Sequence, residues 1–161
     1  MNDRDRHHLT RCVELAEAAL HSGNDPFGSL IVSEAGEVLF EDHNRTVGGD
    51  ATQHPEIAIA RWAATHLSPQ ERRRATVYTS GEHCAMCSAA HGWVGLGRIV
   101  YASSSRQLTN WMKEFGAEPG PVKPLPIQDV LRDSDVEGPE PSLSGRIREL
   151  HQQNIRRQAK T

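Results

Sequence analysis

Apolar side chains recur at helical spacing from Leu9 to Leu20, and this spacing predicts an amphipathic helix that ends at about Ser22. Residues 23–26 then combine glycine, asparagine, aspartate and proline, which together interrupt a helix. Further helical patterns are found over 55–67, 85–94, 104–115 and 143–158. The pattern therefore predicts several helices that each bury one face.

Short segments rich in β-branched residues alternate with these helices. They predict strands over 29–33, 38–41, 75–79 and 98–102. The segment 116–141 is rich in proline and acidic residues and is too long for a simple connection. We expect a short strand near 122–127 within it, and a lid or surface loop over the rest. Strands that alternate with helices indicate an α/β fold, with a central sheet covered by helices on both faces.

The length of 161 residues suits one domain with one hydrophobic core. We place that core at about 9–115 and interpret 116–161 as a lid followed by the C-terminal helix. Hydrophobic residues at 37% and charged residues at 24% are typical of a folded chain. No apolar run is long enough to cross a bilayer, and residues 1–8 do not resemble a secretory signal. The sequence therefore predicts a cytoplasmic protein without a membrane partner.

The formal net charge of −3 argues against the broad basic face of many nucleic-acid-binding proteins. The C-terminal segment is a local exception, because its basic residues outnumber Glu149. These basic residues are Arg146, Arg148, Arg156, Arg157 and Lys160. Two interpretations stay open, a solvated helix face and a phosphate-binding tail.

The three cysteines argue against a disulfide framework, because their number is small and odd. Cys12 lies among the apolar residues of the first helix, and we expect it to be a buried small hydrophobe. Cys84 and Cys87 form a C-x-x-C pair, which needs a chemical explanation.

Catalytic zinc usually has three protein ligands and one position left for water. His54, Cys84 and Cys87 supply such a set, and they lie at the predicted starts of two helices. Backbone N–H groups and the helix dipole stabilise a thiolate at such a position. The sequence therefore predicts one zinc ion per chain, at the point where two helix N-termini converge.

Glu56 follows His54 by two residues, so its carboxylate can reach the surroundings of the metal without binding it. Zinc lowers the pKa of a water molecule to about 7, and a nearby carboxylate can accept the released proton. The same carboxylate can then pass the proton to a ring nitrogen and to a departing amine. We therefore predict that Glu56 is the catalytic base and acid of a hydrolysis that expels ammonia.

An H-x-E motif followed by C-x-x-C is far more specific than either motif alone, and this order is the known signature of zinc deaminases. On these residues the chain resembles the cytidine/deoxycytidylate deaminase superfamily, in the branch of guanine deaminases, fungal cytosine deaminase and tRNA adenosine deaminases. The resemblance extends over about 26–102. It rests on Pro26-Phe27-Gly28, on Asn44, on His54-Pro55-Glu56 and on the block TSGEHCAMC at 79–87.

The resemblance implies a three-layer α/β/α cytidine deaminase-like fold with a mixed five-stranded sheet. It also implies that the backbone N–H of Cys84 holds the substrate carbonyl and that Asn44 binds the substrate base. A homodimer is implied as well, in which the segment after Pro141 can be exchanged so that it completes the pocket of the neighbouring subunit.

Two positions depart from the family pattern. Pro55 replaces the usual small residue, and the first turn of a helix tolerates this change. His83 replaces the proline before Cys84 and brings a titratable group next to the metal ligands. As a fourth zinc ligand His83 would close the site, but adjacent residues rarely chelate one ion well.

Phe27 and Trp93 match positions that are typical of free-base deaminases, so we predict that both contact the substrate. The alternatives are a core or pocket-wall role for Phe27 and a core aromatic role for Trp93. His91 is expected to be buried and hydrogen-bonded, with pocket lining as the alternative. Trp111 and Phe115 either stack on a flat base or pack in the ordinary way.

The acidic balance favours a small neutral heterocycle over nucleic acid. We expect guanine first, then cytosine, then a related triazine or pterin, with the oxo heterocycle and ammonia as products. Three alternatives stay open at this point. They are a tRNA-specific adenosine deaminase, a non-catalytic module stabilised by zinc, and a redox C-x-x-C protein that has no use for His54 or Glu56.

Overall fold

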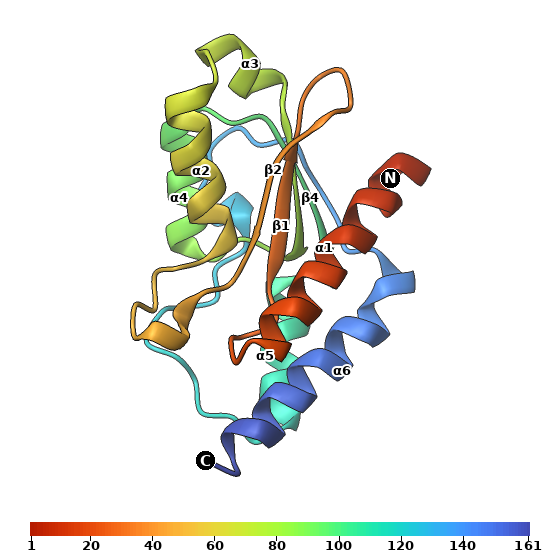
Figure 1. Ribbon diagram of the computed structural model, residues 1–161, viewed down its shortest axis with the longest axis vertical. Helices are drawn as coiled ribbons and strands as arrows, with labels where there is room; N and C mark the ends of the chain where they lie inside the picture. Colours follow the sequence, from red (N-terminus) through yellow and green to blue (C-terminus); the bar gives the residue numbers. More distant parts are fainter.

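The computed structural model describes all of residues 1–161 and places a mixed five-stranded sheet between two helical layers (Figure 1). The strand order is β2-β1-β3-β4-β5. β1 pairs antiparallel with β2 and β3, whereas β3, β4 and β5 are parallel. The strands are β1 (Gly28–Val32), β2 (Val38–His43), β3 (Thr76–Gly81), β4 (Arg98–Ser103) and β5 (Val136–Glu137). This arrangement confirms the predicted fold class.

Helices cover both faces of the sheet, as Figure 1 shows, with α2 and α4 on one face and α1 and α6 on the other. The helices are α1 (Asp3–His21), α2 (Pro55–His66), α3 (Pro69–Arg74), α4 (Ala85–Val94), α5 (Ser105–Glu114) and α6 (Pro141–Gln158). Ile147 and Leu150 of α6 belong to the largest core cluster, together with residues of α1 and Trp111 of α5. The core therefore extends beyond the predicted range of 9–115, because α6 packs on α1 and the sheet.

Strand β1, which lies between β2 and β3, supplies side chains to the core on both faces of the sheet. Its residues alternate between the two faces, as in any strand. Leu30 joins the cluster on the α1 side, whereas Ile31 joins a second cluster with Ile59 and Ala63 of α2. Helices therefore pack against β1 from both faces of the sheet, and β1 is the strand that directly follows Phe27.

Gly28 allows α1 to approach β1 closely. A Cβ atom at this position would lie 2.4 Å from the backbone oxygen of Cys12 and 2.4 Å from Cβ of Leu15. Real Cβ atoms do not approach other atoms so closely, so only glycine fits without movement of the helix. Close packing of α1 on β1 therefore requires glycine at position 28, and this packing fixes the position of the neighbouring Phe27.

The predicted strand near 122–127 is wrong. That segment is irregular and ends in a 3-10 turn at Ile127–Asp129, and the fifth strand is the two-residue β5. Pro124 and Pro126 cannot donate to a strand ladder, which accounts for the difference. Ile127 is fully buried beside Ile99 and Tyr101, so the segment is held by this side chain instead of by strand pairing.

The start of α1 and the presence of α3 also differ from the prediction, and capping explains both. α1 begins at Asp3 instead of near Leu9, because Asn2 and Asp5 form a capping box. The unpredicted α3 begins with a second capping box, formed by Ser68 and Glu71. No helix of the structure has the length and the apolar character needed to span a membrane.

Asp5 connects α1 to the sheet through a buried ion pair. Its carboxylate accepts hydrogen bonds from Arg98 of β4 at 2.9 and 3.2 Å and from the hydroxyl of Tyr78 of β3 at 2.8 Å. Burial by itself would raise the pKa of Asp5, but the hydrogen bonds, led by those from Arg98, hold it well below its ordinary value. The ionised form is therefore the one that stabilises the fold.

Replacing Asp5 by asparagine is expected to lower the free energy of unfolding by about 2 kcal/mol, because Arg98 loses its buried anionic partner. The contribution of Asp5 is fully present above its unfolded-state pKa of 3.8 and is lost as the pH falls below it. Urea denaturation at pH 7 and at pH 3 measures both effects. An equal loss of stability in the variant at both pH values would contradict the assignment.

Candidate metal centre and active-site pocket

Three potential metal ligands meet at the N-termini of two helices. His54 is the N-cap of α2, Cys84 is the N-cap of α4, and Cys87 lies in the first turn of α4. Nδ1 of His54 lies 3.6 Å from Sγ of Cys84 and 3.5 Å from Sγ of Cys87. All three ligand atoms lie within 4.8 Å of one another, which confirms the predicted grouping.

The donor set and its spacing fit zinc. Zinc–sulfur bonds of about 2.3 Å and zinc–nitrogen bonds of about 2.05 Å at a tetrahedral angle place nitrogen and sulfur about 3.5 Å apart. The observed separations of 3.5 and 3.6 Å agree with this value. Two thiolates and one imidazole also match the ligand preference of zinc, and three protein ligands leave one position for water.

The local electrostatics favour a thiolate at Cys84. Hydrogen bonds from the Cys87 thiol and from His54 hold the pKa of Cys84 well below the usual thiol range. The N-terminus of α4 acts in the same direction, because the backbone N–H of Cys87 also lowers the pKa of Cys84. The site therefore supplies the deprotonated sulfur that a divalent metal requires.

Glu56 lies beside the metal ligands without belonging to their group. Its Oε2 is 3.7 Å from Sγ of Cys87, and its Oε1 accepts a hydrogen bond of 2.8 Å from the hydroxyl of Thr79. The hydroxyl of Ser29 in turn donates to Thr79 at 2.8 Å, so two sheet residues orient the carboxylate. Burial raises the pKa of Glu56, and the carboxyl group can therefore hold a proton near the metal.

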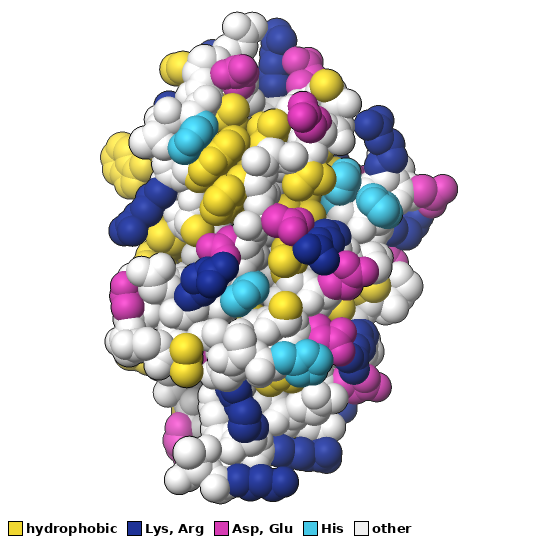
Figure 2. Space-filling view, in the orientation of Figure 1, with side chains coloured by type: hydrophobic (Ala, Val, Ile, Leu, Met, Phe, Trp, Pro, Cys, Tyr) yellow, Lys and Arg dark blue, Asp and Glu magenta, His cyan; other side chains and the backbone are white.

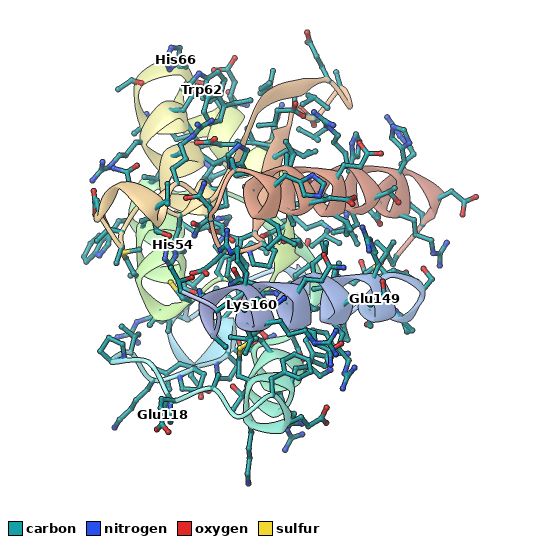
Figure 3. All side chains as sticks on the ribbon, turned by 60° about the horizontal axis from the view of Figure 1, so that its bottom comes forward. His54, Trp62, His66, Glu118, Glu149 and Lys160 are labelled. Carbon is teal, nitrogen blue, oxygen red and sulfur yellow. The ribbon has the colours of Figure 1, made fainter.

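A pocket of about 180 Å³ opens directly beside His54, Glu56 and Cys84. In Figure 3, His54 is seen at the end of α2 opposite to Trp62 and His66. The remaining walls come from four segments and include many hydroxyl groups. They are Phe27, Gly81, Glu82, Ser103, Ser104, Ser105, Leu108, Thr109, Val122, Lys123 and Pro124.

Glu82 fixes one side of this pocket, and it was missed at the sequence level. Its Oε1 accepts the backbone N–H of Ile127 at 2.9 Å, and its Oε2 accepts that of Ser105 at 2.8 Å. One carboxylate therefore joins the start of α5 to the segment that carries Val122 and Lys123 over the pocket. The residue stands inside the TSGEHCAMC block, which was the available signal, whereas nothing in the sequence marked the serines or Lys123.

Replacing Glu82 by glutamine is expected to weaken substrate binding about fivefold, seen mainly as a higher KM. The amide nitrogen cannot accept a hydrogen bond, so one of the two backbone N–H groups loses its partner, at a cost of about 1 kcal/mol. Steady-state ammonia release measures kcat and KM separately. Glu149→Gln, at an exposed position of α6, is the control, and an unchanged KM in Glu82→Gln would contradict the anchoring role.

Asn44 and Phe27 lie together at the edge of the sheet, where β2 ends and β1 begins. The backbone N–H of Asn44 donates to the oxygen of Phe27 at 3.0 Å. Asn44 is buried, and its Oδ1 accepts hydrogen bonds from the backbone and the hydroxyl of Thr46. Phe27 forms a wall of the pocket, whereas Asn44 adjoins Phe27 and is not among the residues that line the pocket.

Trp93 does not reach the pocket of its own chain. Its side chain is 92% exposed near the C-terminal end of α4. The prediction of a core aromatic residue is therefore wrong, because the position faces outward from the α2–α4 layer. The predicted contact with the substrate does not form within a single chain either, since Trp93 is not among the residues that line the pocket.

The other histidines and aromatic residues near the site pack against other side chains or bond to the backbone, and none of them is a metal ligand. His83 is buried and packs edge-on against His91 at 5.4 Å, outside the group of three metal ligands. Nε2 of His91 bonds to the backbone oxygen of Gly97 at 2.8 Å, which confirms the expected buried, hydrogen-bonded role. Trp111 is buried in the main core and Phe115 packs against it, so both are packing residues.

Known proteins with similar sequences are deaminases, which agrees with the arrangement of the site. A family model described as the cytidine and deoxycytidylate deaminase zinc-binding region matches residues 2–103. A probable cytosine deaminase of Schizosaccharomyces pombe is 34% identical over 122 residues, which are 74% of this chain and 72% of that protein. A guanine deaminase of Bacillus subtilis is 32% identical over 96 residues, which are 59% of this chain and 62% of that protein.

A solved structure supports the fold. It comes from a study of A-to-I editing by tRNA:A34 deaminases at the wobble position of transfer RNA, and it covers 90% of this chain and 99% of its own. The TM-score is 0.64 and the sequence identity is 23%. This likeness concerns the fold alone, and the names of the three proteins point to three different substrates.

Proposed function

Because the chain belongs to the cytidine and deoxycytidylate deaminase family, as the match over residues 2–103 shows, we propose that it deaminates a free nucleobase or a related small heterocycle. Membership makes the protein a zinc-dependent hydrolase that acts on C–N bonds. The observation that carries the substrate proposal is the small pocket of about 180 Å³ beside the three metal ligands and the buried Glu56.

The residues of the site suit a hydrolysis in which an amino group leaves. Zinc held by His54, Cys84 and Cys87 supplies Lewis acidity that activates water near neutral pH. Glu56, held by Thr79, takes a first proton from the attacking water at Oε2 and delivers it to the ring nitrogen. It then takes the second proton from the added hydroxyl group and delivers it to the leaving amine. The ring carbon gains an oxygen and loses its nitrogen, so one water is consumed and one ammonia is released.

The backbone N–H of Cys84 suits the predicted role of holding a substrate oxygen. It makes no hydrogen bond within the chain and lies at the N-terminus of α4 beside the pocket. We propose in addition that Phe27 packs on the base and that Nδ2 of Asn44, which makes no hydrogen bond within the chain, donates to it. Both roles follow from the family resemblance and the position of these residues at one edge of the sheet.

Pocket size favours a single heterocycle. Sites for drug-sized ligands usually enclose about 300–1,000 Å³, so a volume of about 180 Å³ suits a base without a sugar. From the sequence we expect guanine as the first substrate and cytosine as the second. The 34% identity to a probable cytosine deaminase raises cytosine to the same rank, with triazines and pterins after both.

A screen of ammonia release tests the proposed function. Zinc-loaded protein is incubated with guanine, cytosine, an aminated triazine, a pterin and cytidine, and ammonia is measured together with the change in ultraviolet absorbance. We expect release from at least one free base and much less from cytidine. Ammonia release from tRNA without release from any free base would overturn the proposal.

The alternative substrate, adenosine in tRNA, draws support from the basic C-terminal helix. Figure 2 shows Lys and Arg side chains at the lower end of the molecule, where α6 ends. Most of the predicted basic residues have intramolecular partners, since Arg146 pairs with Glu17 and Arg148 pairs with Glu114. Arg157 contacts backbone oxygens of the 20–24 segment. The solvated or structural interpretation of this helix is therefore favoured over phosphate binding.

We propose a homodimer in which the α2–α4 layer meets the second subunit. Trp93 projects from this layer with 92% of the residue exposed, and tryptophan is enriched at protein–protein interfaces. Exchange of the C-terminal segment is not required for packing, because α6 covers its own core through Ile147 and Leu150. Light scattering coupled to size exclusion tests the proposal, and a monomer at micromolar concentration would contradict it.

A further inference from the structure

A second cavity lies next to the catalytic pocket, on the other side of Phe27 and Leu108. It has a volume of about 410 Å³, and both side chains line the two cavities. Its remaining walls come from α5, from the segment that follows α5, from α6 and from the loop between α1 and β1. Figure 3 shows Glu118, one of the lining residues, at the lower left of that view, on the segment that follows α5. No metal ligand lines this cavity.

His151 of α6 is the unusual residue of this cavity. Only 3% of the residue is exposed, and its ring makes no hydrogen bond within the chain. The ring packs edge-on against Phe27 at 5.0 Å and lies 6.5 Å from Trp111. Burial lowers the pKa of His151 to about 4, so the imidazole is neutral at pH 7 and offers one N–H donor and one acceptor. Its ring nitrogens are not among the fully enclosed polar atoms of the chain, so the polar edge of the ring is accessible to an occupant of the cavity.

A fixed carboxylate stands beside His151. Oδ1 of Asp25 accepts hydrogen bonds from Nδ2 of Asn154 at 2.7 Å and from Nε2 of Gln158 at 3.2 Å. Oδ2 of Asp25 makes no hydrogen bond within the chain, so it is open to a donor from outside. Arg157 donates to Oδ1 of Asn154 and thereby holds the whole group in place. The polar wall is therefore built and oriented before any ligand binds.

A second part of the lining, the apolar wall, consists of hydrophobic side chains. Phe27 and Leu108 continue into Met112 of α5 and Ile155 of α6, and these side chains form a surface on which a flat ring can lie. Asp25 and Glu118 give the cavity an acidic lining, which disfavours phosphate and carboxylate groups. The ligand that matches both walls is aromatic, uncharged and rich in N–H donors along one edge.

We propose that the cavity lined by Asp25 and His151 is a second binding site, for an amino-substituted aromatic heterocycle. Its amino group donates to Oδ2 of Asp25, a ring nitrogen pairs with His151, and its face packs on the apolar wall. The assignment of this ligand to the same chemical class as the substrate rests on the proposed function. Because Phe27 and Leu108 separate the two cavities, an occupant here contacts the back of the catalytic pocket, and the apparent affinity for substrate depends on both sites.

Binding stoichiometry tests this proposal without any need for turnover. The probe is 2-aminopurine, a fluorescent aminated heterocycle, and the protein is the zinc-loaded Glu56→Gln variant. Equilibrium dialysis is expected to show two molecules bound per chain. Adding His151→Phe, which keeps an aromatic ring but removes both ring nitrogens, is expected to weaken one of the two sites by about tenfold or more.

Ile155→Trp serves as an independent variant, because it fills the cavity and leaves the polar wall untouched, and it is also expected to remove one site. His66→Phe makes the same chemical change at an exposed position of α2 and should keep both sites. A single site in the Glu56→Gln parent, or two sites of unchanged affinity in both cavity variants, would overturn the proposal.

The binding and deamination measurements together distinguish a failure of the second-site proposal from a failure of the proposed function. Deamination of a free base by a chain that binds one 2-aminopurine overturns the second site alone. The chain could instead fail to deaminate any free base and still bind 2-aminopurine at a site that both His151→Phe and Ile155→Trp remove. That result supports the second binding site and rejects the proposed substrate.

Discussion

Replacing Glu56 by glutamine is expected to lower turnover by about 10²–10⁴-fold while the zinc content stays at one ion per chain. Glutamine has nearly the same shape and can still accept the hydrogen bond of 2.8 Å from Thr79, so the pocket keeps its form. It cannot accept a proton from water and return it to the leaving amine. The effect should therefore fall on kcat, because the missing group acts in the transition state.

Two measurements on the same sample distinguish chemistry from folding. Ammonia release gives the turnover, and elemental analysis gives the zinc content. Glu37→Gln, at an exposed position, is the control and should match the parent protein in both. Equal turnover in Glu56→Gln and the parent would rule out the proton-transfer role, whereas loss of zinc would place Glu56 among the metal ligands.

Replacing Cys87 by serine is expected to remove both zinc and activity. The thiolate is one of only three protein ligands, and a hydroxyl is a poor substitute for it on zinc. Removing a partner that only supports a ligand costs about 10–100-fold in metal affinity, so removing a ligand should cost more. We expect turnover to fall by more than about 10²-fold, with zinc content well below one per chain.

The third cysteine provides a matched control. Cys12 is fully buried in the main core and does not belong to the metal group, so Cys12→Ala should keep zinc and activity even if stability falls. In the parent protein, a strong chelator should abolish ammonia release, and added zinc should restore it. Full activity in a chelated sample or in Cys87→Ser would contradict a catalytic role for zinc.

Local patterns predicted much of the fold because most of its elements are specified by neighbouring residues. Helical spacing located α2, α4, α5 and α6, and the apolar segments located the first four strands. The misplaced fifth strand shows the limit of such patterns. β5 has only two residues and forms by pairing with β4, so its position depends on a contact between distant segments.

In the candidate site too, local features could be predicted from the sequence, whereas contacts between distant segments could not. The spacing of H-x-E and C-x-x-C could be read in the sequence, because each motif occupies one helix start and needs only local geometry to present its side chains. The anchoring by Glu82 could not be read, because its two partners, Ser105 and Ile127, lie 23 and 45 positions away along the chain. Trp93 was misread because the outward face of α4 is set by packing against α2 and the sheet.

By itself, the sequence determined the family, the zinc ligands and the class of reaction, because these depend on the chemical identity of a few residues at short spacing. Only the tertiary structure decided the shape of the pocket, the residues that close it and the cavity behind Phe27. Those features arise where α5, α6 and the segment before Ile127 come together at one end of the sheet. Contacts of this kind leave no periodic signal in the chain, since they join residues whose separation in sequence is set by the fold and not by a local repeat.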